Sequence, residues 1–397
     1  MNPFSFYNPV RVVFGPGVFE RLGTECSSLG KKALLVSYSS PGPLGPVIEK
    51  AQRLLENAGI ACVPFCGVSP NPLTSEARKG VALAREHKVD MVIGLGGGSA
   101  MDSAKIIAAG FYYEQDLWNM IISRHDANTS IPPQKALPIV LVPTLPATSS
   151  EMNAGAVITN DEKMEKSYVF NENLFAHKAI MDPELTLSLP AYQSALGAAD
   201  AVSHAMETYL NTEEDCHLQR RLALSCIETI MEAIQKILKD PKDIAARTTM
   251  MWAACVAWNG WTSTGADHGC PMHQLGHVLS ARYNVPHGGT LAIIMPAWMK
   301  YNLEMNLQRY AALDAQLFKK TSAHYDAAAG REMISRFEGW LKQIGVPTRL
   351  GDAGVKADAI DSMAQDVIRI SGRADGTVNG RPGVGLEDVK AIYRLAL

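Results

Sequence analysis

The sequence has few cysteines and no pairing pattern among them. Its 397 residues include seven cysteines, an odd number, scattered along the chain without a Cys-x-x-Cys spacing. Such a set argues against the dense disulfide framework of a small secreted domain and favours a reducing compartment. The N-terminus also lacks the basic start and continuous apolar stretch of a secretory signal peptide. We therefore expect a cytoplasmic protein.

Strong net charge and long apolar runs are missing as well. The formal net charge of −3 gives no basic surface to attract DNA, RNA or an anionic membrane. No uninterrupted apolar run approaches the roughly 20 residues of a membrane-spanning helix. What is present is the composition of a globular enzyme, with 47% hydrophobic and 19% charged residues. We expect neither a nucleic acid nor a membrane as partner.

The first half of the chain alternates short apolar runs with helix-length segments. Strands that alternate with helices predict a mostly parallel sheet with helices on both faces. Two of the runs are almost wholly apolar, as strands covered on both faces should be. The expected strands are residues 33–38, 61–65, 91–96, 139–144, 155–160 and 179–183.

The character of the sequence changes near Pro190. Beyond it the segments are long, have the length of helices and contain few β-branched runs. We therefore predict an α/β domain in residues 1–190 and an all-helical domain in residues 191–397.

Three glycines stand between a buried strand and a helix. Gly96-Gly97-Gly98 lets the backbone approach a ligand closely, and the N–H groups of the following helix suit a pyrophosphate. The run is not a G-x-G-x-x-G fingerprint, however, and a tight turn without a ligand explains it equally well. Ser99 and Asp102 have the spacing of a capping box, which predicts that they fix the start of the helix.

A polar loop follows the strand at 139–144, at the end where α/β sheets bind ligands. Its hydroxyls, among them those of Thr144 and Thr148, can hydrogen-bond phosphate or ribose oxygens. An ordinary loop that caps the next helix is the alternative. The loop therefore supports the glycine turn without deciding its role.

Four of the ten histidines lie between residues 268 and 287. Asp200 and His204 are four residues apart on one predicted helix, and His273 and His277 repeat that spacing on another. His287 stands on a turn before a further helix. Three imidazoles and one carboxylate can surround Fe²⁺ or Zn²⁺ and leave one position open for a substrate oxygen. Each residue alone also has a structural explanation, but polar groups inside apolar helices need a reason for their desolvation.

In their joint order, these motifs resemble the iron-containing (group III) alcohol dehydrogenases, in particular the branch of NADPH-dependent aldehyde reductases and butanol dehydrogenases. The likeness is close to full length, and its specificity lies in the order of the motifs. They are residues 9–17, 70–72, 96–105, 143–158, 181–190, 197–210, 272–297 and 344–350.

The resemblance implies that residues 1–190 are an α/β dinucleotide-binding domain and residues 191–397 an all-α metal-binding and substrate domain. It also implies a role for each candidate residue. It implies metal ligands at Asp200, His204, His273 and His287, and a proton relay through His277 near the substrate. It also implies a pyrophosphate on the glycine turn, with other residues beside the ribose and nicotinamide. The cofactor residues are Asn71, Gly97, Gly98, Ser99, Asp102, Thr144, Thr148 and Lys166.

The residues after the strand at 33–38 bear on the choice of cofactor. NAD-preferring members of the family often carry an Asp there, which bonds the adenosine ribose and repels a 2′-phosphate. This chain has Tyr38, Ser39 and Ser40, which carry no negative charge and offer hydroxyl groups. We therefore expect NADP(H) in preference to NAD(H), with one divalent metal, Fe²⁺ or Zn²⁺.

The expected function is that of a metal-dependent alcohol dehydrogenase or aldehyde reductase acting on small aliphatic substrates, as a homodimer or larger homo-oligomer. A glycerol-type polyol dehydrogenase is the nearest alternative. A lyase like dehydroquinate synthase would need a basic clamp, and the helical segments around the histidines offer only Arg282 and Lys300. A metal-binding protein without turnover is the third alternative.

Overall fold

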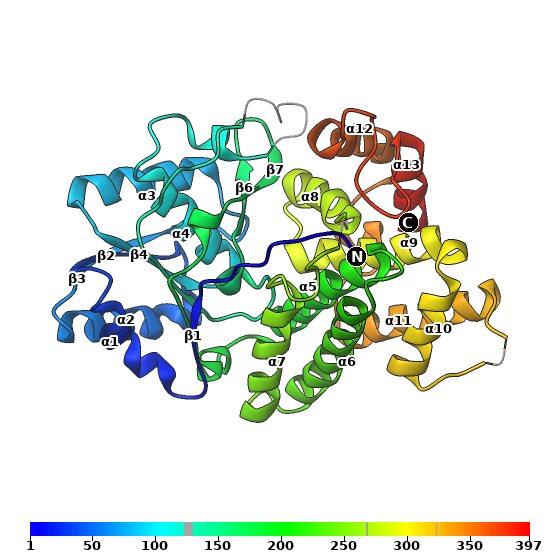
Figure 1. The fold of residues 1–397 in the computed structure, drawn as a ribbon, viewed down its shortest axis with the longest axis horizontal. Helices are drawn as coiled ribbons and strands as arrows, with labels where there is room; N and C mark the ends of the chain where they lie inside the picture. Colours follow the sequence, from blue (N-terminus) through cyan, green and yellow to red (C-terminus); the bar gives the residue numbers. More distant parts are fainter. Residues whose placement is uncertain (123–129, 267–268, 323) are drawn as a thin grey trace. The chain divides into compact units, whose positions relative to one another are not determined.

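The computed structural model describes residues 1–122, 130–266, 269–322 and 324–397 (Figure 1). They form two compact units. The α/β unit comprises Tyr7–Pro190 and Asp240–Cys255, and the helical unit comprises Met1–Phe6, Ala191–Lys239 and Val256–Leu397. Among the helices described, none combines the length and apolarity needed to cross a membrane.

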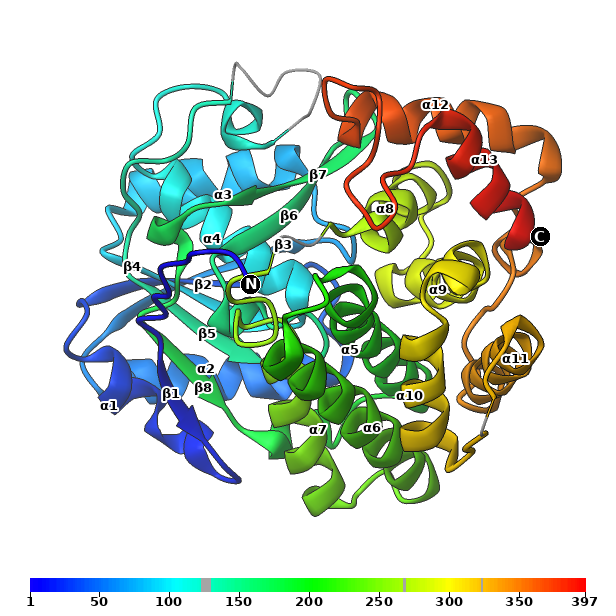
Figure 2. The ribbon, with the colours of Figure 1, turned by 45° about the vertical axis from the view of Figure 1, so that its right-hand side comes forward.

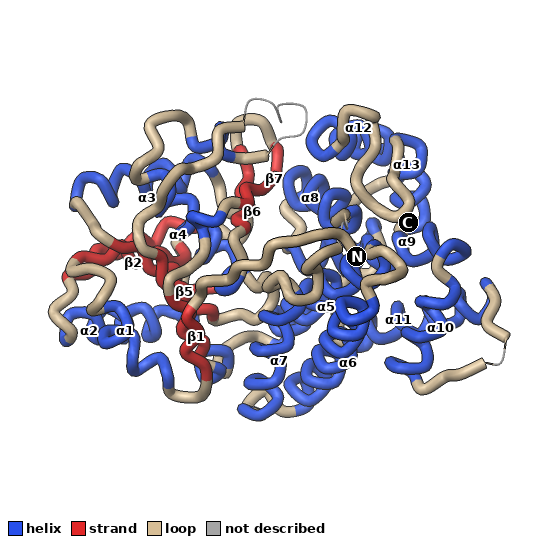
Figure 3. The backbone as a smooth tube through the Cα atoms, in the orientation of Figure 1, coloured by secondary structure: helices blue, strands red, loops and turns tan. Residues whose placement is uncertain are grey.

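The α/β unit is built on a six-stranded parallel sheet, drawn in red in Figure 3. Its strand order is β1-β8-β5-β4-β2-β3. The mostly parallel sheet expected from the sequence is therefore confirmed. The strands are β1 (Arg11–Phe14), β2 (Lys32–Tyr38), β3 (Ala61–Val68), β4 (Met91–Gly96), β5 (Ile139–Pro143) and β8 (Lys178–Met181).

Both faces of this sheet are covered by helices. Leu34 and Val36 of β2 belong to an apolar cluster with helices α3 and α4, whereas Ala33 and Leu35 belong to a second cluster with α1 and α2. Alternate residues of a strand point to opposite faces, so β2 is buried on both sides. Figure 2 shows the two pairs of helices on either side of the sheet. These helices are α1 (Leu22–Cys26), α2 (Gly45–Asn57), α3 (Thr74–His87) and α4 (Gly98–Gly110).

One expected strand pairs elsewhere. Residues 155–160 form β6 (Gly155–Asn160), which pairs antiparallel with β7 (Glu165–Phe170) in a separate hairpin. Only the other late strand, β8, joins the main sheet. Apolar patterning identifies a strand but not its partner, and the short link to β7 makes a hairpin the local solution.

The sheet has a switch point at β2. From β2 the chain goes to β3 on one side and then to β4 on the other. Open α/β sheets bind ligands at the carboxyl ends of the strands beside such a point. Here those ends are Tyr38 of β2 and Gly96 of β4.

The helical unit is organised around α5 (Ala191–Asn211), which is buried along almost its whole length. It packs against α6 and α9, and α9 packs in turn against α8 and α13. A helix enclosed in this way can carry polar side chains only where its neighbours satisfy them. The other helices are α6 (His217–Lys239), α8 (Pro271–Tyr283), α9 (His287–Asn302), α10 (Leu307–Phe318), α11 (Ala327–Gln343), α12 (Ile360–Ser371) and α13 (Leu386–Leu395), while α7 (Ile244–Ala257) belongs to the α/β unit through Cys255.

Arg309 of α10 closes the C-terminal end of α5. Its guanidinium donates to the carbonyl oxygens of Tyr209, Leu210 and Thr212 at 2.6–3.0 Å. The last carbonyls of a helix lack partners within it, and a cation at this end also complements the helix dipole. Arg309 therefore fixes the C-terminal end of α5, the helix that carries Asp200 and His204, against α10.

Candidate metal centre and cofactor site

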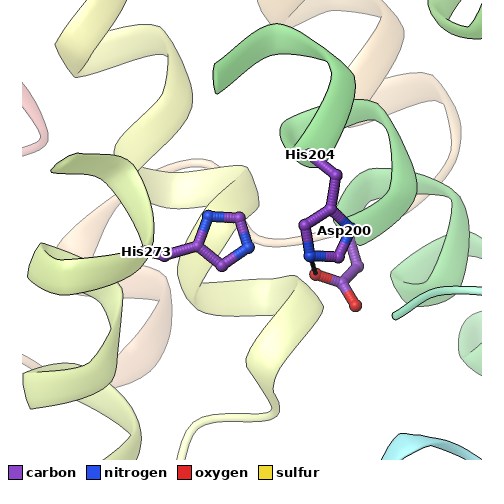
Figure 4. Close-up of side chains that lie close together, drawn as sticks. All are labelled: Asp200, His204 and His273. Atoms are coloured by element: carbon purple, nitrogen blue, oxygen red, sulfur yellow. Dashed lines mark ion pairs between the residues drawn. The ribbon is translucent and has the colours of Figure 1, made fainter. Parts of the chain in front are cut away.

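Two helices of the helical unit bring Asp200, His204 and His273 together. The first two lie one turn apart on α5, and the third lies in the first turn of α8. Each offers one ligand atom, and the three atoms all lie within 4.8 Å of one another. Figure 4 shows the His273 ring directed toward the other two side chains. Their exposed fractions are 4%, 6% and 12%, so the cluster is almost entirely buried.

His287, the first residue of α9, joins this cluster through Asp200. Its Nε2 lies 3.6 Å from Asp200 Oδ1, and its ring centroid lies 5.4 Å from that of His273. The group of three within 4.8 Å does not include it. His277, one turn beyond His273, is buried, with its ring centroid 5.7 Å from that of His287. All five residues predicted for this site therefore lie in one neighbourhood.

This donor set fits a divalent cation of the Fe²⁺ or Zn²⁺ class. Imidazole and carboxylate are ligands that both ions accept, and the three ligand atoms are already close together. Two acidic side chains of α5, Asp200 and Glu207, are also buried here. Buried carboxylates are costly unless cations or hydrogen-bond donors accompany them. A bound divalent cation would supply compensating positive charge.

Glu207 is a residue of this site that the sequence analysis missed. It follows His204 by three residues on α5 and is fully buried. The backbone N–H of His273 donates to its Oε1 at 3.0 Å, and the same oxygen lies 3.1 Å from Nδ1 of that ring. Burial raises the pKa of Glu207 well above its ordinary value, against the N–H groups that donate to it. The spacing of 200, 204 and 207 on one helix face could have revealed it.

Trp258 covers two of the candidate ligands. Its ring stacks on those of His204 and His273, with centroid distances of 5.1 and 6.1 Å and interplanar angles of 26° and 13°. Trp261, in contrast, is 42% exposed. Trp258 therefore belongs to the candidate metal centre.

In the α/β unit, the glycine turn joins β4 to α4 at the switch point of the sheet. The Gly97 N–H donates to the Tyr38 hydroxyl at 3.1 Å, which ties the ends of β2 and β4 together. Burial raises the pKa of Tyr38 to about 12, while Ser39-Ser40 beyond it are exposed. A Cβ on Gly98 would lie 2.5 Å from Cγ2 of Thr148, so a larger residue does not fit without a shift. Close packing against Tyr38 and Thr148 therefore shapes the turn.

The predicted capping box at this turn is wrong. Helix α4 begins at Gly98, and no side chain caps it. The Ser99 hydroxyl donates instead to the carbonyl oxygen of Pro70 at 2.6 Å. Asp102 is buried inside the unit and binds a neighbouring segment. Ser99 and Asp102 have the spacing of a capping box, but both side chains form hydrogen bonds with segments distant in the sequence instead.

Asp102 and Lys105 of α4 hold the segment 148–157. Lys105 is fully buried, and burial lowers its pKa to about 8. Burial also raises the pKa of Asp102, against the attraction of Lys105. The segment that carries Thr148 is thus anchored on the helix that follows the glycine turn. The partners are Ser150 and Val157 for Asp102, and Asn153 and Gly155 for Lys105, at 2.7–2.9 Å.

The other predicted cofactor residues lie around the same strand ends. The Thr144 N–H donates to the Gly96 carbonyl oxygen at 2.9 Å. Lys166 of β7 donates from Nζ to Oδ1 of Asn71 at 3.1 Å, and Asn71 follows the Pro70 that Ser99 binds. The cofactor residues predicted from the sequence therefore form one neighbourhood in the α/β unit.

Comparison with known proteins gives the family. The model described as "Iron-containing alcohol dehydrogenase" matches residues 9–183, and the model of the C-terminal part of the same family matches residues 194–397. The chain belongs to the iron-containing alcohol dehydrogenase family. It is an NAD(P)-dependent alcohol dehydrogenase, which confirms the resemblance drawn from the sequence motifs.

Several relatives match over the full chain. NADH-dependent butanol dehydrogenase A of Clostridium acetobutylicum is 33% identical over 99% of both chains. Probable NADH-dependent butanol dehydrogenase 1 of Bacillus subtilis is 34% identical over 100% of both. NADPH-dependent aldehyde reductase YqhD of Escherichia coli is 31% identical over 91% of this chain and 92% of its own. Both cofactors are thus named among the relatives.

A solved structure matches closely in its fold. The crystal structure of NADH-dependent butanol dehydrogenase A from Thermotoga maritima has a TM-score of 0.93 and 34% sequence identity, and covers 100% of this chain and 99% of its own. The predicted architecture of an α/β part followed by a helical part is confirmed by this likeness.

Proposed function

We propose that this alcohol dehydrogenase interconverts small aliphatic aldehydes and alcohols at one divalent metal, Fe²⁺ or Zn²⁺, held by Asp200, His204, His273 and His287. The observation that carries the proposal is the group of three buried ligand atoms within 4.8 Å of one another. The substrate class rests on relatives named butanol dehydrogenase and aldehyde reductase. Those names favour this function over a polyol dehydrogenase, a lyase or a protein without turnover.

The proposed chemistry is a reversible hydride transfer. When bound, the metal supplies a Lewis acid for the substrate oxygen and NAD(P)H supplies the hydride. In reduction the carbonyl carbon gains the hydride and the oxygen gains a proton, and oxidation of the alcohol reverses both. His277 is the proposed proton donor, because its ring is buried 5.7 Å from that of His287. From a ring nitrogen it would give the proton in reduction and take it back in oxidation.

The cofactor is proposed to bind the α/β unit with its pyrophosphate on Gly97, Gly98 and Ser99. The start of α4 supports this, since backbone N–H groups and the helix dipole there favour an anion. NADP(H) is proposed in preference to NAD(H), because the exposed residues Ser39-Ser40 beyond β2 carry no negative charge. A 2′-phosphate would meet hydroxyls there rather than a repelling carboxylate.

The rest of the proposal concerns organisation. Residues 1–190 are proposed to bind the cofactor, and residues 191–397 to bind metal and substrate. A cytoplasmic location and a homodimer or larger homo-oligomer complete it. Light scattering of the purified enzyme tests the assembly, and cell fractionation tests the location.

The experiment for the function is an assay with butanal on enzyme stripped by a chelator and reloaded with Fe²⁺ or Zn²⁺. The fall in NADPH and NADH absorbance is followed separately. Metal-dependent oxidation that is faster with NADPH supports the proposed reaction, the metal requirement and the cofactor preference. Activity with NADH alone would overturn the cofactor preference. Metal binding without turnover of any aldehyde would overturn the proposed reaction.

A further inference from the structure

Glu207 is a buried carboxylate for which the proposed reaction has no use. It lies on the same helix as Asp200 and His204, and its exposed fraction is 0%. Among the ion pairs of the described residues, Glu207 takes part in one, with His273. An acidic group in such a place is costly unless hydrogen bonds or a positive charge offset its desolvation, so its partners indicate its role.

Both oxygens of this carboxylate are engaged. Oε1 accepts the backbone N–H of His273 at 3.0 Å, and Oε2 accepts the side-chain N–H of Asn211 at 2.9 Å. The Nδ1 atom of His273 lies 3.1 Å from Oε1. Because N–H groups already donate to both oxygens, the carboxylate acts as an acceptor toward Nδ1 as well. We therefore assign the proton of this contact to Nδ1, and Nε2 is then the ring nitrogen that can bind a metal.

The backbone contact adds a second constraint. His273 is the third residue of α8, where backbone N–H groups have no partner within the helix. Glu207 satisfies that N–H from α5, so its carboxyl group links the two helices at the start of α8. One carboxylate thus fixes the ring, its tautomer and the position of the backbone that carries it.

We infer that Glu207 is the positioning residue of the metal centre, which orients His273 and thereby sets the affinity of the site for its metal. The inference rests on the proposed function, because it takes His273 as a ligand. Carboxylates that accept the second ring N–H of a metal-binding histidine raise its basicity and hold its ring in place. In this chain α5 then supplies two ligands and the group that orients a third.

The test compares Zn²⁺ affinity of the purified full-length enzyme and its variants, by competition with a chromophoric chelator. Glu207→Ala should weaken Zn²⁺ binding about 10- to 100-fold, the usual range for loss of such a partner. Glu207→Gln should weaken it less, because the amide oxygen can still accept the Nδ1–H. The visible absorption of Co²⁺-loaded enzyme gives a second readout, which should change in Glu207→Ala as His273 loses its fixed orientation.

Asp314→Asn is the matched control. Asp314 is a buried acid of the same unit, 3% exposed, that accepts a bond from Arg336 instead of a candidate ligand. It should lower the thermal stability without changing Zn²⁺ affinity or the Co²⁺ spectrum. A parallel loss of affinity in Asp314→Asn would mean that Glu207 acts through general stability, which would overturn the inference.

The outcomes separate this inference from the proposed function. A wild-type enzyme that binds neither Zn²⁺ nor Fe²⁺ would overturn both, and for one that binds Fe²⁺ alone the variants are compared by their Fe²⁺ affinity. A wild type that binds Zn²⁺, with a folded Glu207→Ala of equal affinity, would overturn the inference alone. If Glu207→Ala fails to fold, Glu207→Met decides, because it fills the same space but has no oxygen to accept the Nδ1–H. An unchanged Zn²⁺ affinity and Co²⁺ spectrum in a folded Glu207→Met would refute the positioning role.

Discussion

The metal centre and the glycine turn are built in opposite ways. In the candidate metal centre, side chains from α5, α8 and α9 converge, and their carboxylate and imidazole groups are the proposed ligands. In the glycine turn, side chains are missing, and the backbone between β4 and α4 is shaped by what packs on it. Behind the turn, Asp102 and Lys105 hold the segment that carries Thr148.

This difference predicts how each site fails. The metal centre should fail when a side chain is removed, because a ligand is lost. The turn should lose its shape when atoms are added to its glycines, or when the buried side chains of Asp102 and Lys105 are removed. Since each site lies within one of the two units, a change in one should leave ligand binding at the other intact.

The largest effect is expected from His204→Ala. Loss of one ligand should remove most of the metal's stabilisation of the transition state, worth about 4 kcal/mol or a ~10³-fold fall in kcat/KM for butanal. The dissociation constant of NADPH, measured by fluorescence, should not change. His217→Ala, at an exposed histidine of the same unit, is the control and should keep full activity. Equal losses of kcat/KM and NADPH affinity in His204→Ala would contradict the independence of the two sites.

Lys105→Met tests the support beneath the turn through its pH dependence. Burial lowers the pKa of Lys105 from 10.5 to about 8. At a pH between these two values, Lys105 is protonated in the unfolded chain and neutral in the folded chain. The contribution of Lys105 to stability is therefore full above pH 10.5 and is lost as the pH falls through about 8. The free energy of unfolding of the wild type, relative to that of Lys105→Met, should rise by about 2 kcal/mol between about pH 7.5 and about pH 9.5.

Urea unfolding of both metal-free proteins at the two pH values measures this gain. Lys50→Met, at a half-exposed lysine of α2 in the same unit, serves as the control. A stability gap between wild type and Lys105→Met that stays constant with pH would refute the effect of burial on Lys105.

Gly98→Ala adds one methyl group to the turn. The new Cβ would lie 2.5 Å from Cγ2 of Thr148, so either the turn or the loop must move. Overpacking of this kind costs about 1–3 kcal/mol, and a displaced turn that loses as much free energy of NADPH binding binds NADPH about 5- to 150-fold more weakly. Titration of NADPH fluorescence measures it. Gly45→Ala, where a Cβ meets nothing within 4 Å, is the control, and Zn²⁺ affinity should be unchanged in both. Unaltered NADPH binding in Gly98→Ala would separate this turn from the cofactor.

The smallest effect is expected from Ser39→Asp. An acid beyond β2 should repel a 2′-phosphate and accept a ribose hydroxyl, and so move the preference toward NADH. At an exposed position the change in the ratio of kcat/KM values should be roughly fivefold. Ser39→Asn has nearly the same size without the charge and should leave the ratio unchanged. A similar shift in both variants would rule out charge as the cause.

Much of the fold could be predicted from local patterns. The wholly apolar runs of β4 and β5 indicate strands buried on both faces, and the long segments after Pro190 indicate helices. The pairing of β6 with β7 could not be read in this way, because periodicity identifies an element and not its neighbours. For the same reason, nothing in the sequence of α7 indicates that it joins the α/β unit.

The two sites differ in how far the sequence reveals them. Four-residue spacings pair Asp200 with His204 and His273 with His277, because residues that far apart share one face of a helix. Glu207 shares the face of the first pair but was missed, because an acid in a helix has many ordinary explanations. At the turn, the bonds of Asp102 to segment 148–157 depend on chain segments distant in sequence, and the capping-box spacing of Ser99 and Asp102 predicted the wrong partners.

The position of Trp258 has a consequence for the fluorescence of the protein. Its indole stacks on two of the imidazoles that we propose as ligands, at 5.1 and 6.1 Å. An excited indole at that range is sensitive to the electrons of an ion that those rings hold. An open-shell ion such as Fe²⁺ offers a path for quenching that the filled shell of Zn²⁺ lacks. We therefore expect the fluorescence of Trp258 to be weaker in the Fe²⁺-loaded enzyme than in the Zn²⁺-loaded enzyme, so that it reports which metal is bound.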